Sequence, residues 1–174
     1  MGDREKLEAL LVSGNLSSAI SVASSSDIRH ELFSVIGAYF SKMGDTSKAK
    51  IFYLQSMEAR PNAEAEFGFG ISLLKEGRPG DSIEFFRSSS RDKSYSIPSL
   101  MKMGEAMRLT GDITGSLRCY LSAKSLGHQG SALDINIATL LSDMGRFDLA
   151  DEFYEKGISR SHDNEKVRFN YSLH

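Results

Sequence analysis

Four glycines at almost equal intervals constrain the fold of this chain more than any other feature. The intervals between them are 33, 34 and 34 residues, at Gly44, Gly77, Gly111 and Gly145. Five residues after each glycine stands a small residue, and four residues further on an aromatic one: Ala49 and Tyr53, Ser82 and Phe86, Ser116 and Tyr120, Ala150 and Tyr154. Self-similarity at this period predicts a stack of similar structural units instead of one globular core.

Residues 31–61 indicate what one unit is. Apolar residues recur there at intervals of three and four on both sides of Gly44, which predicts two helices with one buried face each. Gly44 can adopt the left-handed conformation that ends a helix, and Asp45 offers a side-chain oxygen to cap the next one. Pro61 cannot continue the second helix. The unit is therefore predicted to be a helical hairpin.

The repeated positions resemble the tetratricopeptide repeat family, whose 34-residue pattern is W-x2-L-G-x2-Y, then A-x3-F, then P. The glycine or alanine of the first helix stands seven residues before each turn glycine, at Gly37, Gly70, Gly104 and Ala138. The tryptophan position departs from the pattern, since it holds Phe33, Glu66, Leu100 and Asp134. The resemblance implies an all-α, right-handed superhelical solenoid of about eleven helices.

The resemblance also divides the chain. Residues 1–174 are expected to form a single solenoid, which begins with a degenerate hairpin or cap over residues 1–29. Four full units follow, and the last residues read as the first helix of an incomplete or capping unit. The predicted ranges are 30–62, 63–96, 97–130 and 131–164 for the full units and 165–174 for the last helix.

Several classes of function find no support in the sequence. A formal charge of -2 with scattered lysines and arginines provides no basic surface for nucleic acid. No stretch approaches the ~20 apolar residues of a membrane span, so no membrane insertion is expected. Cys119 is the only cysteine, which favours a cytoplasmic location. The four histidines lack metal-binding spacing, and no nucleotide or nucleophile motif occurs. We therefore expect no metal, no cofactor and no enzyme activity.

The resemblance implies a binding site on the concave face, which the first helices line. Positions three before, one after and four after the first glycine of each unit are expected there. In the first full unit these are small residues, Ser34, Ala38 and Ser41. In later units they include apolar residues, which suit the binding of a peptide or an amphipathic helix: Phe67, Ile71, Leu74, Met101, Ile135 and Phe169. A polar row, Lys102, Glu105 and Arg108, and the amide of Asn136 are expected to hold a peptide backbone or a terminal carboxylate. The alternative is that the apolar residues pack between neighbouring first helices.

Three functions are consistent with this pattern. The first is a non-catalytic adaptor or scaffold that binds a protein or peptide partner in the concave groove. The second is self-assembly, in which the helix over residues 165–174 pairs with another copy and makes a homo-oligomer. In the third, the chain is one segment of a longer protein, which could be an enzyme such as a glycosyltransferase or a methyltransferase.

Overall fold

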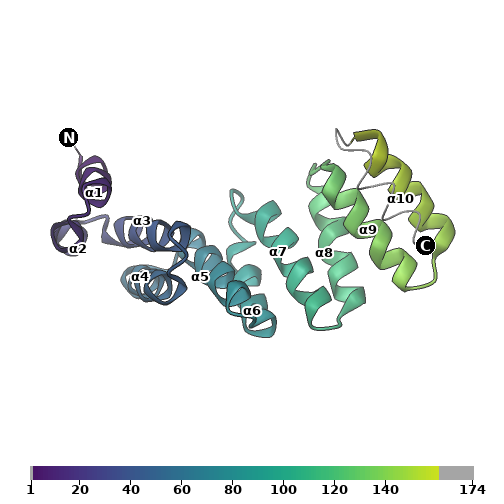
Figure 1. Ribbon diagram of the computed structural model, residues 1–174, viewed down its shortest axis with the longest axis horizontal. Coiled ribbons are helices and arrows are strands. Elements are labelled where there is room, and N and C mark those ends of the chain that lie inside the picture. Colours follow the sequence, from purple (N-terminus) through teal and green to yellow (C-terminus); the bar gives the residue numbers. More distant parts are fainter. Residues whose placement is uncertain (1, 161–174) are drawn as a thin grey trace. The chain divides into compact units, whose positions relative to one another are not determined.

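The computed structural model describes residues 2–160, and most of these are helical (Figure 1). Within this range the chain forms ten helices and no strand: α1 (Asp3–Val12), α2 (Leu16–Ser25), α3 (Arg29–Lys42), α4 (Thr46–Ala59), α5 (Ala63–Lys75), α6 (Pro79–Ser89), α7 (Ser96–Leu109), α8 (Ile113–Ser125), α9 (Ser131–Asp143) and α10 (Phe147–Arg160). The expected all-α array of helical hairpins is confirmed. The helix predicted over residues 165–174 lies outside the described residues.

The turns inside the hairpins share one backbone conformation. The glycine that ends the first helix has a positive φ in each hairpin, for example 80° at Gly44 and 85° at Gly111. A residue with a side chain would be strained there. In two of these turns the following aspartate caps the second helix, since Asp45 accepts a hydrogen bond from the backbone N–H of Lys48 at 3.0 Å and Asp112 from that of Gly115 at 2.8 Å.

The aromatic residue of α4 packs between two successive hairpins. Tyr53 of α4 lies against Gly37 of its own hairpin and against Gly68 of α5. A Cβ atom at these two glycines would come within 2.7 Å and 2.2 Å of the Tyr53 ring. Real Cβ atoms do not approach a ring so closely, so the ring occupies space that only glycine leaves open. The sequence places an aromatic residue at this position, and the structure shows what it touches.

The chain forms two compact units, which are described separately. Among the described residues, the first unit runs up to Tyr95 and holds α1–α6, and the second begins at Ser96 and holds α7–α10. The core of the first unit contains stacked rings, with Phe40 and Phe52 centred 5.5 Å apart and nearly parallel. The core of the second unit contains aliphatic side chains and two tyrosine rings: Leu133, Ile137, Leu140, Leu141, Tyr120 and Tyr154.

Buried polar side chains in the first unit form a small network. The Ser34 hydroxyl lies 2.8 Å from that of Ser56, which also accepts a hydrogen bond from the Asn62 amide at 2.9 Å. Asn62 in turn caps α5 by accepting from the backbone N–H of Ala65 at 2.9 Å. The expectation that Ser34 lines a groove is wrong, because its side chain is fully buried in this network. Its hydroxyl instead joins the hairpin of α3 and α4 to the start of α5.

In residues 2–160, none of the helices has the length and apolar character that crossing a bilayer requires.

Candidate functional site

The first helices of the first unit form an open depression of about 300 Å³, here called the N-terminal depression. Its floor and walls come from α3 and α5, with Tyr53 of α4 and Tyr95 beyond α6. Two residues expected at a groove, Phe67 and Ile71, line it, and so do the small residues Ala38 and Ser41. The structure therefore brings together groove positions of two successive repeats. Leu74, also expected there, is half-buried but does not line this depression.

Phe67 is held in a cluster of aromatic rings. Its ring centroid lies 5.7 Å from that of Phe86 and 5.6 Å from that of Tyr95. These distances are typical of favourable ring pairs. Phe67 is half-buried, so one part of the ring packs in the unit and another part lines the depression. The same side chain can therefore both pack inside the unit and contact a ligand in the depression.

Glu64 at the start of α5 is the acidic residue of the N-terminal depression, which Lys42 also lines. Burial raises the pKa of the Glu64 carboxyl; the Arg4 guanidinium opposes this increase, and the Glu31 carboxylate adds to it. Burial also raises the pKa of Tyr53 to about 12, with a contribution from Glu64. Sequence reasoning missed Glu64, because an acidic residue in the first turn of a helix is common and needs no ligand to explain it.

A second depression, of about 460 Å³, adjoins the first and reaches α1. Ala38, Lys42 and Glu64 belong to the lining of both depressions, so the two are continuous along α3 and α5. Arg4 and Leu11 contribute the wall from α1. The first helices of the first unit therefore present one hollowed strip, which polar and apolar side chains line together.

The second unit has its own depression, of about 360 Å³, here called the C-terminal depression. It contains five of the expected groove residues together with the Tyr120 ring: Met101, Lys102, Glu105, Arg108 and Asn136. The Lys102 ammonium pairs with the Glu105 carboxylate at 2.8 Å. Neither the Arg108 guanidinium nor the Asn136 amide makes a side-chain hydrogen bond to a described residue. These two groups therefore have hydrogen-bonding capacity for a ligand.

Ile135, which was also expected at the groove, does not line this depression. Ile135 packs into the core of the second unit, where its Cγ1 atom lies against Gly157 of α10. A Cβ atom at Gly157 would come within 2.9 Å of that carbon. Phe169 lies outside the described residues.

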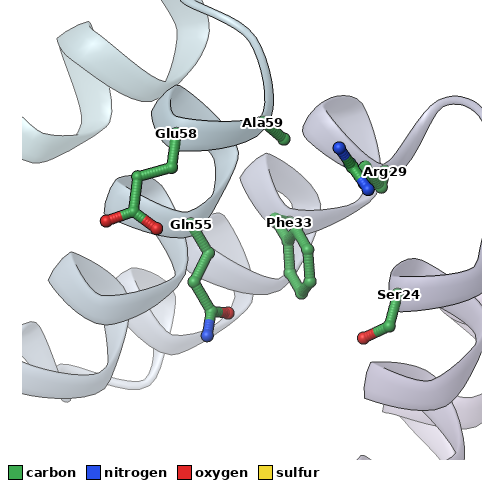
Figure 2. A pocket seen from close by; sticks show the side chains of 6 residues that line it. All are labelled: Ser24, Arg29, Phe33, Gln55, Glu58 and Ala59. Atoms are coloured by element: carbon green, nitrogen blue, oxygen red, sulfur yellow. The ribbon is translucent and has the colours of Figure 1, made fainter.

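A further hollow, of about 330 Å³, was not expected from the sequence. Figure 2 shows Phe33 of α3 between Gln55 of α4 and Ser24 of α2, with Arg29 and Glu58 nearby. The sequence pattern assigned Phe33 to the core, and the ring is in fact 8% exposed. No sequence signal marks the hollow, because its polar residues come from three helices and follow no motif.

Groups suited to metal binding do not gather anywhere in residues 2–160. No three side chains of the histidine, cysteine, aspartate or glutamate type come together there as metal ligands. The Cys119 sulfur is buried and lies 3.7 Å from the sulfur of Met107. A thiol in such apolar surroundings is poorly suited to attack a substrate.

Comparisons with known proteins agree with this architecture. The model of the tetratricopeptide repeat family matches residues 30–63 and 135–164. No curated protein matches the chain in sequence.

Solved structures with the same fold cover nearly the whole chain. One, described as YrrB, a TPR protein with an unusual peptide-binding site, has a TM-score of 0.80 and 12% identity over 99% of this chain and 91% of its own. MamA has a TM-score of 0.78 and 14% identity over 92% of this chain and 96% of its own. PilF of Pseudomonas aeruginosa has a TM-score of 0.77 and 13% identity over 95% of this chain and 78% of its own. At these identities the likeness shows the fold alone.

Proposed function

We propose that this chain, which carries tetratricopeptide repeats and has the fold of proteins built from them, is a non-catalytic adaptor or scaffold that binds a peptide or helix of a partner protein. The observation that carries the proposal is the pair of depressions on the first helices, one in each unit. Each depression combines half-buried apolar side chains with polar groups, which is the usual composition of a recognition site. We place this function in the cytoplasm, because the chain has a single cysteine.

The two depressions offer different contacts. In the first unit, Phe67 and Ile71 provide apolar anchors for side chains of the bound segment. In the second unit, Met101 provides an adaptable apolar surface, and Arg108 and Asn136 provide donors for a peptide backbone. Affinity would come mainly from the anchors and specificity from the polar groups. The peptide-binding site in the description of YrrB supports the idea that this fold can serve such a role.

A pull-down with a charge-insertion variant tests the proposal. In Phe67→Glu/Met101→Glu, a carboxylate enters each depression at a half-buried apolar position. The matched control is Ile51→Glu/Leu121→Glu, which inserts the same charges at residues of α4 and α8 that are 53% and 42% exposed. Both variants are first checked for helical content by circular dichroism. We expect a partner retained by the wild type and by the control to be lost by the groove variant. Retention of every partner by the groove variant would contradict the proposal.

A further inference from the structure

Glu64 is unlike the other partly buried acidic residues of the first unit. Its carboxylate makes no hydrogen bond and no ion pair with any residue in the described part of the chain. Glu66, two residues later, accepts a hydrogen bond from Ser88 at 2.7 Å, and Glu76 pairs with Lys50 at 2.6 Å. A partly desolvated carboxylate without a partner has lost water without gaining a compensating contact. It is therefore prepared to accept a donor from outside the chain.

The surroundings of Glu64 restrict what that donor can be. The rings of Tyr53, Phe67 and Tyr95 line the same depression, and the last two pack against each other at 5.6 Å. Aromatic faces attract cations and exclude most other polar groups. Two cationic side chains of the chain lie near Glu64. Lys42 lines both depressions and Arg4 lines the adjoining one, but neither forms an ion pair with the Glu64 carboxylate.

We propose that the N-terminal depression binds the arginine side chain of a partner segment, with the Glu64 carboxylate accepting its guanidinium N–H groups between the surrounding rings. This inference rests on the proposed function and adds the chemistry of the bound residue. Ala38 and Ile71 line the depression where the aliphatic part of the side chain would pack. The raised pKa of the Glu64 carboxyl agrees with this assignment, because a bound cation would offset the burial that raises it.

Arginine fits this site better than lysine for three physical reasons. Its guanidinium is planar and can donate two parallel hydrogen bonds to one carboxylate. It stacks on aromatic rings, and it holds its hydration water less tightly than an ammonium group does. A lysine ammonium would have to give up more hydration to enter a depression with three aromatic rings.

The probe for the test is the capped tripeptide acetyl-leucyl-arginyl-leucine amide, titrated into isotopically labelled chain and followed by NMR. The control peptide carries citrulline, which keeps the shape of arginine and removes the charge. We expect saturable shifts at the amides of Ala38, Phe67, Gly68 and Ile71. We expect Glu64→Gln to weaken binding at least about tenfold, since a hydrogen bond to a charged group contributes roughly that much. Glu66→Gln, on the same helix, can still accept from Ser88 and should bind as the wild type does.

Each other result overturns the inference. Equal binding of the citrulline peptide, equal binding by Glu64→Gln, or shifts confined to another surface would show that no guanidinium pairs with Glu64. So would the lack of any saturable shift. Tighter binding of the matching lysine peptide would overturn the assignment to arginine.

The two experiments can contradict the proposed function and this inference independently. A partner lost by Phe67→Glu/Met101→Glu but retained by Glu64→Gln would leave the adaptor function standing and remove the arginine assignment. The opposite result is also possible: Glu64→Gln weakens binding of the arginine peptide, while Phe67→Glu/Met101→Glu retains every partner protein. That result would support the arginine site and contradict the adaptor function.

Discussion

The carboxylate of Asp134 on α9 is fully buried and accepts a hydrogen bond from the guanidinium of Arg160 on α10. It also pairs with the ammonium of Lys124 on α8. The tetratricopeptide pattern has tryptophan at this position, where a large ring would fill the space between helices. Here a buried anion and two partly exposed cations connect three successive helices of the second unit. Both cations reach solvent, with 27% and 39% of the Lys124 and Arg160 side chains exposed.

Removal of both cations should destabilise the protein far more than removal of either one. In Lys124→Met or Arg160→Met, Asp134 keeps one partner, and we expect each variant to lose about 1 kcal/mol. In the double variant the buried carboxylate has no partner, and we expect a loss of about 3–5 kcal/mol. Urea unfolding measures both. Lys156→Met, which removes an exposed lysine that pairs with Glu152, should stay within about 0.5 kcal/mol of the wild type. Simple additivity of the two single losses would show that the pairs act independently.

Gly68→Ala should destabilise the first unit, although alanine is the better helix former. The added Cβ atom would lie 2.2 Å from the Tyr53 ring, which fits tightly between α3 and α5. Overpacking of this kind costs about 1–3 kcal/mol, against a gain in helix propensity of up to about 1 kcal/mol. Thermal unfolding should therefore show a lower Tm. The clash is with the Tyr53 ring itself, so it should disappear when the ring is removed. We therefore expect Gly68→Ala to lower the Tm less in the Tyr53→Leu variant than in the wild type.

Stability should fall at alkaline pH because buried tyrosines resist ionisation in the folded state. Burial raises the pKa of Tyr53 to about 12 and also raises the pKa of Tyr95 and of Tyr120. Below about pH 10 both the folded and the unfolded chain hold these protons, so no effect is expected. Between pH 10 and 12 the unfolded chain ionises first, and unfolding becomes more favourable. Urea midpoints measured across this range should decrease, and Tyr53→Phe should make the decrease shallower. A flat profile would contradict the burial of these hydroxyls.

Glu64→Gln should stabilise the free protein slightly at neutral pH. Burial raises the pKa of the Glu64 carboxyl above 4.5, so the folded state favours the protonated form. Stability then decreases as the pH rises from about 4.5 through the raised pKa, and the loss persists above it. Glutamine removes this pH-dependent loss. The measurement is the urea midpoint at pH 4 and pH 7 for both proteins. A variant that is less stable than the wild type at pH 7 would indicate that Glu64 already has a partner within the chain.

Local features of the sequence predicted the helices and their ends. Gly44 and Gly111 end helices because the left-handed conformation suits glycine, and Asp45 and Asp112 begin the next helices because their side chains reach the backbone N–H groups three residues on. These causes act within a few residues, so they can be read from the chain directly. The repeat period then predicted that such hairpins stack, and the all-α fold is confirmed.

The sequence placed the candidate site only in part. Phe67 and Ile71 line one depression, and Met101, Lys102 and Arg108 line another; that these residues bind a partner stays a prediction. The repeat register was wrong for Ser34, which is buried. Sequence reasoning missed Glu64 and the contribution of Tyr95, because nothing local distinguishes an acidic residue that pairs with a neighbour from one that does not.

The sequence by itself determined that this chain forms repeated helical hairpins, because turn conformation, capping and helix periodicity depend on neighbours along the chain. Only the tertiary structure decided which side chains meet across helices. Tyr53 occupies the space that Gly68 leaves open, Asp134 is buried between Lys124 and Arg160, and the Glu64 carboxylate makes no hydrogen bond or ion pair with a residue in the described part of the chain. Each of these outcomes depends on distances between residues that are remote along the chain, and those distances are set when the hairpins pack.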